Sequence, residues 1–228
     1  MAMSYTTLDR LTMALLNGDF SKAKEIVDLY IAGGSGQHWR RAYELITQAM
    51  RYIGTMWENN LITVADEHIA SMTCKYLLHA LFLEQEQQHR LPPLPAVQRA
   101  MFFCVENEQH DIGITIVAQL FKEKGWDTRL LGANLPLEYA VMHAKKWKPK
   151  VVGLSVTLPY HLSRVPAYTH ALEQLPHRPI ILVGGRAVQL YDISSLCSPS
   201  TLIIKDVDAL QQLLAEWGDG GLCATNGL

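Results

Sequence analysis

The feature that most constrains this chain is an apolar run, residues 100–105, which ends in a polar turn and is followed by a helical pattern. A short apolar run bounded by a turn is typical of a buried strand. The apolar residues Ile114, Val117 and Leu120 then recur at helical spacing. In an open α/β sheet, ligands bind beside such corners, at the carboxyl ends of the strands. We therefore expect a ligand site close to residues 104–113.

The turn itself carries one imidazole, His110, with Glu106, Glu108 and Asp111 beside it and Gly113 at the start of the helix. A phosphate site would need backbone N–H groups and positive charge, so a nucleotide is a poor fit. A carboxylate two residues before a histidine suits a metal ligand, because it fixes the tautomer and raises the basicity of the coordinating nitrogen. On these residues alone, a histidine at a strand end is more often a solvated loop residue than a ligand.

Strand and helix patterns alternate through the second half of the chain. The expected strands are residues 99–105, 128–131, 151–155, 180–183 and 202–204. The expected helices are residues 111–124, 137–146, 161–174, 187–190 and 207–217. Alternating units of this kind predict a flavodoxin- or Rossmann-like, five-stranded parallel sheet flanked by helices, with the strand order 2-1-3-4-5.

The first half has helical periodicity and little proline. Four amphipathic segments, near residues 8–16, 21–31, 37–59 and 63–88, predict an antiparallel four-helix bundle. Thr63, with Asp66 three residues later, predicts the N-cap of the fourth helix. Prolines cluster between the two halves, so we expect a helical domain at 1–90, a linker at 91–96 and an α/β domain at 97–228.

Composition excludes several classes of function. The formal charge is −2, which gives no electrostatic signature for nucleic acid. The sequence has no apolar segment long enough to span a membrane and no signal-peptide pattern at its start. The four cysteines are far apart and lack the spacing of a zinc site. These features predict a cytoplasmic protein with reduced thiols that does not bind DNA directly.

Two further strand ends are chemically unusual. The hydroxyls of Ser155 and Thr157, before Leu158, suit hydrogen bonds to a polar ring or a ribose. Gly184 and Gly185 would let a flat, bulky group approach the backbone. No second cluster of metal ligands accompanies His110 in the pattern. A single protein ligand suggests a cofactor that supplies the equatorial donors of its own metal.

The order of these motifs resembles the cobalamin-binding signature D-x-H-x-x-G, S-x-L, G-G. The matching stretches are Glu108-x-His110-x-x-Gly113, Ser155-x-Thr157-Leu158 and Gly184-Gly185. Residues 131–136 also look like the second strand-to-helix turn of that family. The resemblance implies that His110 is the lower axial ligand of cobalt and that the Ser and Gly positions line a slot for the nucleotide tail. Glu108 replaces the usual Asp, so Asp111 and Glu106 are alternative partners for the histidine.

The helical half adds a second resemblance. Trp57, Glu67 and His68 match the W-x9-E-H motif of the helical caps in CarH-like adenosylcobalamin photoreceptors. The resemblance implies that these three residues shape the upper face of the cofactor. Glu58 stands where the well-known photoreceptor has a histidine that captures cobalt after photolysis. The amino-terminal DNA-binding domain of that family is expected to be absent, because the sequence pattern starts directly with the bundle.

Together these resemblances imply a cobalamin-binding light sensor and regulator rather than an enzyme. The expected cofactor is adenosylcobalamin, with methylcobalamin and hydroxocobalamin as alternatives. The signal would pass to a protein partner, a transcription regulator or signalling protein, through changed contacts, and a homo-oligomer would fit such a role. Two other classes remain: a corrinoid methyl carrier of a methyltransferase system, and a cobalamin storage or delivery protein.

Overall fold

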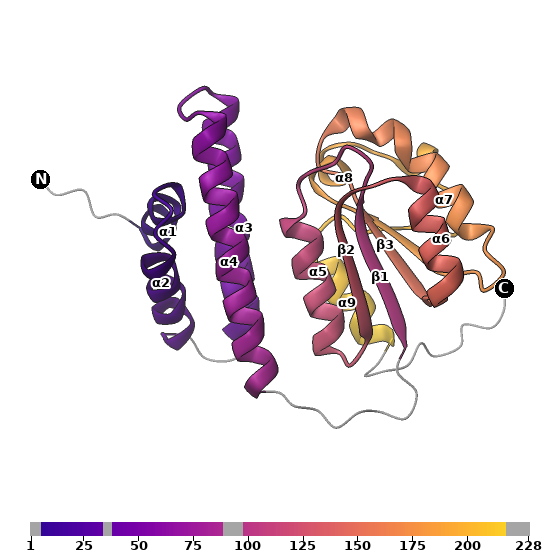
Figure 1. Cartoon of the computed structure of the whole chain (residues 1–228), viewed down its shortest axis with the longest axis horizontal. Helices are drawn as coiled ribbons and strands as arrows, with labels where there is room; N and C mark the ends of the chain where they lie inside the picture. Colours follow the sequence, from indigo (N-terminus) through magenta and orange to yellow (C-terminus); the bar gives the residue numbers. More distant parts are fainter. Residues whose placement is uncertain (1–5, 34–37, 89–97, 218–228) are drawn as a thin grey trace, which may run out of the picture. The chain divides into compact units, whose positions relative to one another are not determined.

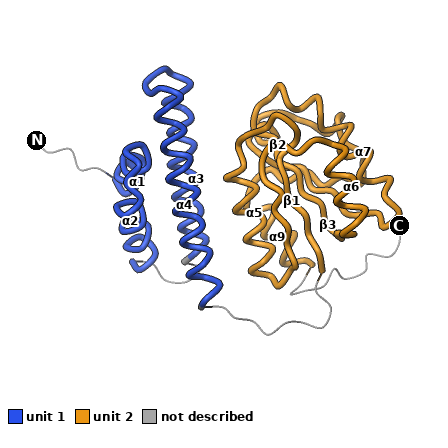
Figure 2. Tube along the Cα trace, in the orientation of Figure 1, with its two compact units in different colours: residues 1–90 blue, residues 91–228 orange. Residues whose placement is uncertain are grey.

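The computed structural model describes residues 6–33, 38–88 and 98–217. The chain forms two compact units, Met1–Arg90 and Leu91–Leu228 (Figure 2). The expected linker at residues 91–96 lies outside the described residues. Within the described ranges, no helix combines the length and apolar character needed to cross a membrane.

The first unit contains the four predicted helices. They are α1 (Thr7–Leu16), α2 (Phe20–Ala32), α3 (His38–Glu58) and α4 (Val64–Gln88). The start of α4 is fixed by a reciprocal cap, because the Thr63 backbone N–H donates to Asp66 Oδ2 at 2.8 Å and the Asp66 N–H donates to Thr63 Oγ1 at 3.3 Å. The N-cap predicted at Thr63 is therefore confirmed. Asn60, with φ of 55°, turns the chain between α3 and α4.

Helix α4 is apolar on two faces. One face is buried in the bundle and includes Ala70, Cys74, Leu77, Leu78 and Leu81. The other face keeps large apolar side chains exposed, among them Ile69, Met72, Tyr76 and Leu83. A helix of this kind has an apolar stripe left over after it has filled the core of its own bundle.

The second unit is the predicted parallel sheet, ordered β2-β1-β3-β4-β5. The strands are β1 (Arg99–Val105), β2 (Asp127–Leu135), β3 (Val151–Ser155), β4 (Ile180–Gly184) and β5 (Leu202–Ile203). The helices are α5 (Ile112–Glu123), α6 (Leu137–Trp147), η1 (Pro159–Arg164), α7 (Val165–Glu173), α8 (Arg186–Leu190), η2 (Ser194–Leu196) and α9 (Val207–Trp217). All four strand pairings are parallel, so the predicted fold and strand order are confirmed.

Both faces of the sheet are covered by helices (Figure 1). On one face, alternate residues of β1 such as Phe102 pack on Phe121 of α5, which also meets Trp217 of α9. On the other face, Phe103 and its neighbours pack against α6, α7 and α8 in a continuous buried cluster. Strands buried on both faces explain why the sequence shows unbroken apolar runs instead of alternation.

Two elements differ from the sequence prediction. Strand β2 runs on to Leu135, so residues 132–135 belong to the strand and not to a strand-to-helix turn. The pairing register with β1 shifts twice in this part of the strand, and Gly132 and Asn134 have φ of 78° and 54°. Gly and Asn with positive φ are also typical of turns, so the sequence alone does not distinguish such an irregular strand from a loop. The expected helix at 161–174 begins as a 3₁₀ turn, Pro159–Arg164, before α7.

Candidate functional site

Three strand ends meet in register at the carboxyl edge of the sheet. Cys104 of β1 pairs with Ser155 of β3, and Ser155 pairs with Gly184 of β4. The loops that follow these strands carry the histidine, hydroxyl and glycine motifs. Sequence reasoning predicted this meeting, because parallel strands place their carboxyl ends at one edge.

Glu108 lies at the centre of this edge and is fully buried. Its Oε1 accepts from the His110 backbone N–H at 3.1 Å and lies 2.6 Å from His110 Nδ1. Its Oε2 accepts from the backbone N–H groups of Thr157 and Leu158 at 2.8 and 3.0 Å, and lies 3.1 Å from His161 Nδ1. One carboxylate therefore binds the loop after β1 to the loop after β3.

These contacts keep Glu108 ionised. Burial by itself raises the pKa of the Glu108 carboxyl, but hydrogen bonds from the His110 side chain, the Leu158 backbone and the His161 side chain outweigh burial and lower the pKa to about 2. A buried carboxylate with this many donors is stabilised in its charged form. The site thus holds one fixed negative charge at neutral pH.

The charge of Glu108 sets the tautomer of both neighbouring imidazoles. A carboxylate can only accept, so His110 and His161 carry their protons on Nδ1. The His110 side chain is 48% exposed, and Nε2 is the nitrogen through which its ring would bind a metal. A histidine ligand oriented by a buried carboxylate is the usual construction of a metal site in proteins.

The loop that carries His110 is fixed from the side of β2. Asn107, with φ of 69°, donates its backbone N–H to Asn134 Oδ1 at 2.7 Å, and the Asn134 N–H donates to the Glu108 carbonyl at 2.9 Å. The unexpected extension of β2 therefore has a structural role, because it supplies Asn134. Such fixation holds the imidazole in one position before any ligand arrives.

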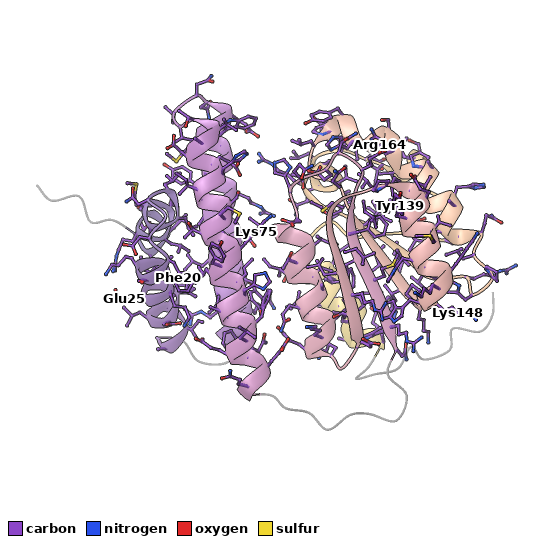
Figure 3. All side chains as sticks on the ribbon, in the orientation of Figure 1. Phe20, Glu25, Lys75, Tyr139, Lys148 and Arg164 are labelled. Carbon is purple, nitrogen blue, oxygen red and sulfur yellow. The ribbon has the colours of Figure 1, made fainter. Side chains whose placement is uncertain are left out.

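Glu106 and Asp111 are the two other carboxylates that the sequence offers as partners for His110. Glu106 accepts from Arg164 at 2.6 Å (Arg164 is labelled in Figure 3). Asp111 occupies the N-cap position of α5, and its side chain makes no capping hydrogen bond. Glu108 contacts the His110 ring directly, at 2.6 Å from Nδ1. Glu at this position can therefore take the role that the motif usually gives to Asp.

Ser155, Thr157 and Leu158 lie where the motif predicted, at and just after the end of β3. Ser155 is buried, while Thr157 and Leu158 are half-buried. Over the described ranges of the chain, neither the Ser155 nor the Thr157 hydroxyl forms a hydrogen bond to another protein group. Two hydroxyls without protein partners at a strand end suit a polar ligand that enters beside β3.

The glycines of the motif have different surroundings. A Cβ atom on Gly113 would meet nothing within 4 Å, so this position opens on space. A Cβ on Gly185, which has φ of 113°, would come within 2.3 Å of the Val156 carbonyl oxygen. Gly185 is therefore required because the protein's own backbone packs against it. The sequence had suggested a different reason, the close approach of a ligand.

The motif residues of the bundle gather at one end of the first unit. Trp57 lies in the last turn of α3 with 46% of its surface exposed. Glu67 accepts from Ser71 Oγ at 2.5 Å and lies 3.8 Å from the ring of His68, whose side chain is 74% exposed. Exposed Trp and His side chains beside a polar turn are available for a ligand or partner.

His161 is the site residue that sequence reasoning missed. It lies in η1, is 6% exposed, and contacts Glu108 and the ring of Tyr160. The sequence offered only a histidine at the start of an expected helix, with no spacing that linked it to residue 108. Only the side-by-side placement of β1 and β3 brings the two residues together.

The donor set of this edge suits a cofactor that brings its own metal. Among the residues that the structure describes, no group of three or more His, Cys, Asp or Glu could hold a metal ion. A single oriented imidazole, two hydroxyls without protein partners and the open position at Gly113 instead fit a corrinoid with one axial position to fill.

Comparison with known proteins agrees with this geometry. Models of B12-binding domains match residues 7–81 and 98–193, which together make up most of the chain. The chain is similar to two HTH-type transcriptional repressors of Myxococcus xanthus. It is 31% identical to CarA over 94 residues (41% of this chain, 31% of CarA) and 25% identical to CarH over 147 residues (64% of this chain, 47% of CarH). The chain thus spans less than half the length of these relatives.

Among solved structures, the chain resembles the monomethylamine corrinoid protein of Methanosarcina barkeri. The TM-score is 0.71 at 19% identity, over 92% of this chain and 97% of that one. Identity at this level shows a shared fold, in which a helical unit precedes a Rossmann-like unit. The chain belongs to the family of B12-binding domain proteins.

Proposed function

We propose that this chain is a cobalamin-binding sensor and regulator that uses adenosylcobalamin as its chromophore and signals through changed protein contacts. The observation that carries the proposal is the His110 imidazole, held by the buried Glu108 carboxylate at the carboxyl edge of the sheet. When bound, adenosylcobalamin supplies a weak cobalt–carbon bond that visible light cleaves.

The residues of the second unit would hold the lower side of the cofactor. His110 would be the axial ligand through Nε2, with Glu108 fixing the ring and its tautomer. Ser155 and Thr157 would hydrogen-bond the nucleotide tail in place of water. Gly113 would leave room for the corrin beside the start of α5.

Residues of the first unit would recognise the upper ligand. Trp57 offers a flat ring for a large adenosyl group, and Glu67 and His68 offer polar contacts. Loss of a group that Trp57 recognises would change the packing of this end of the bundle. A two-state surface of this kind can pass a signal to a partner.

The sequence relatives favour regulation over methyl transfer. Both relatives are transcriptional repressors, whereas the corrinoid protein shares only the fold. The partner would therefore be a transcription regulator or another signalling protein. A methyl carrier of a methyltransferase system is the second candidate, because it shares the arrangement of helical unit and sheet unit.

Illumination separates these two functions. The full chain is loaded with adenosylcobalamin or methylcobalamin in the dark. Absorption spectra, size-exclusion profiles and hydrogen exchange are recorded before and after green light. A sensor should prefer adenosylcobalamin and change its oligomeric state or hydrogen exchange after light. A protein that prefers methylcobalamin and keeps the same profile after illumination would contradict the proposal and favour the methyl carrier.

A further inference from the structure

We propose that the amino-terminal edge of the sheet carries a docking surface for an acidic, amphipathic protein segment. The surface, here called the basic surface, consists of Arg99, Arg129, Lys145, Lys146, Lys148 and Lys150, all of which are exposed. It lies at the opposite end of the strands from His110, because Arg99 starts β1 whereas His110 follows its end. Four of the six cations fall within the hexapeptide 145–150.

The fold draws these cations together around one indole. The Arg99 guanidinium donates to the Trp147 carbonyl at 3.0 Å and lies 5.7 Å from the centre of the Trp147 ring. The Arg129 guanidinium lies 4.5 Å from the same ring centre. Lys150 joins this group because its backbone N–H donates to the Arg99 carbonyl at 2.8 Å.

Little negative charge balances this cluster. Within the described parts of the chain, Arg99 has a single carboxylate neighbour, Asp127 at 3.8 Å, and the other five cations have none within ion-pair distance. The bundle helix α2 shows the contrast, since its exposed Lys22 forms a close pair with Glu25 at 2.8 Å. A concentrated charge without counter-ions in a chain of net charge −2 favours an acidic partner.

His143 shows how positive this surface is. Its Nε2 lies 3.3 Å from the Arg129 guanidinium, which can only donate, so this nitrogen accepts. Partial burial lowers the pKa of His143, and the charges of Arg129 and Lys146 lower it further. The ring therefore stays neutral and adds no repulsion at physiological pH.

Exposed apolar residues continue the basic surface along α6. Tyr139 and Met142 are 53% and 60% exposed, and they share a face of the helix with Lys146 at helical spacing. Figure 3 labels Tyr139 and Lys148, which lie at the beginning of α6 and just after its end. A partner with carboxylates at one end and apolar side chains at the other would match this face.

The same features argue against nucleic acid as the partner. Trp147 is 6% exposed and covered by guanidinium groups, so no aromatic face is open for stacking a base. Apolar Tyr139 and Met142 have no counterpart in a phosphate backbone. The proposed occupant is therefore a protein segment rich in Asp or Glu and with an apolar face.

This inference extends the proposed signalling function, since it gives the partner a place to bind. Its test uses the full chain without cobalamin, so failure here would leave the cofactor assignment untouched. The probe is a fluorescent amphipathic helical peptide of glutamate, leucine and alanine. A second peptide has glutamine at every glutamate, and a short DNA duplex is the third probe.

The variant Lys145→Gln/Lys146→Gln/Lys148→Gln removes three charges from the basic surface. The control Lys22→Gln/Lys75→Gln/Lys205→Gln removes three elsewhere. We expect the acidic peptide to bind wild type and the control alike, and to bind the first variant about tenfold more weakly. Met142→Gln should also weaken binding, without changing its salt dependence. No binding of the acidic peptide, equal binding by both triple variants, or tighter binding of the duplex would overturn the proposal.

Discussion

His161 Nδ1 lies 3.1 Å from Oε2 of Glu108, although 53 residues separate the two in the chain. Both side chains are buried, so their interaction is shielded from water. Because the other oxygen of Glu108 holds His110, the two loops at the carboxyl edge of the sheet form one hydrogen-bonded unit. Changes in the loop after β3 should therefore reach the histidine after β1.

His161→Ala should destabilise the protein by about 1–3 kcal/mol, because it removes a donor from a buried carboxylate. It should also weaken cobalamin binding, although His161 is not the proposed ligand. The measurements are urea unfolding and cobalamin titration of the full chain. His170→Ala, in the same half of the chain but exposed, is the matched control. Identical unfolding of the two variants would contradict the role of His161.

Glu108→Gln should cost about 2–4 kcal/mol of unfolding free energy, because a neutral amide replaces an anion that accepts from five donors. Glu106→Gln makes the same chemical change two residues away, at a half-buried ion pair with Arg164, which is the one side-chain donor to the Glu106 carboxylate among the described residues. This variant should cost less, about 1 kcal/mol. Chemical denaturation of both variants measures the difference. Equal losses would mean that Glu108 is not the centre of the site.

The sequence predicted the edge of the sheet where the site lies but not its internal bonding. Apolar runs predicted β1 and β3, and the polar residues that follow each run placed His110 and Ser155 at strand ends. His161 was missed because its link to Glu108 depends on strand pairing, which spacing along one chain does not show. The extension of β2 was missed because Gly132 and Asn134 are residues typical of loops, whereas the structure places them in an irregularly paired part of the strand.

Glu173 gives a prediction for pH. Partial burial raises the pKa of Glu173, but hydrogen bonds from Ser198, Thr201 and Ser200 outweigh burial and lower the pKa below its usual value. A carboxyl with a depressed pKa in the folded state stabilises the fold above its unfolded pKa of about 4.3, and this contribution is lost as pH falls through the folded value.

Glu173→Gln should therefore cost about 1 kcal/mol at neutral pH, and the difference from wild type should shrink as the pH falls below about 4. Glu138→Gln, at an exposed position of α6, is the control for the loss of one carboxylate from the same unit. Urea unfolding across this range makes the comparison. A difference that grows toward acid would have the wrong sign for this account.

Trp57→Ala should reduce the preference for adenosylcobalamin over methylcobalamin, because the ring would no longer recognise a large upper ligand. Tyr52→Ala is the matched control, because Tyr52 lies on the same helix as Trp57 and has the same exposed fraction, 46%. Competitive titration with both cobalamins measures the ratio of affinities. If Trp57→Ala and Tyr52→Ala discriminate as wild type does, Trp57 is an ordinary surface residue of the bundle.

The central claim is that His110 supplies the lower axial nitrogen of cobalt. The direct measurement is the electron paramagnetic resonance spectrum of the cob(II)alamin form, bound to protein grown with nitrogen-15 histidine. If His110 is the ligand, the triplet splitting of ordinary nitrogen becomes a doublet, and His110→Ala loses both this signal and most of its affinity. A triplet that persists in the labelled protein would show that the cofactor's own base remains bound, and would contradict the account.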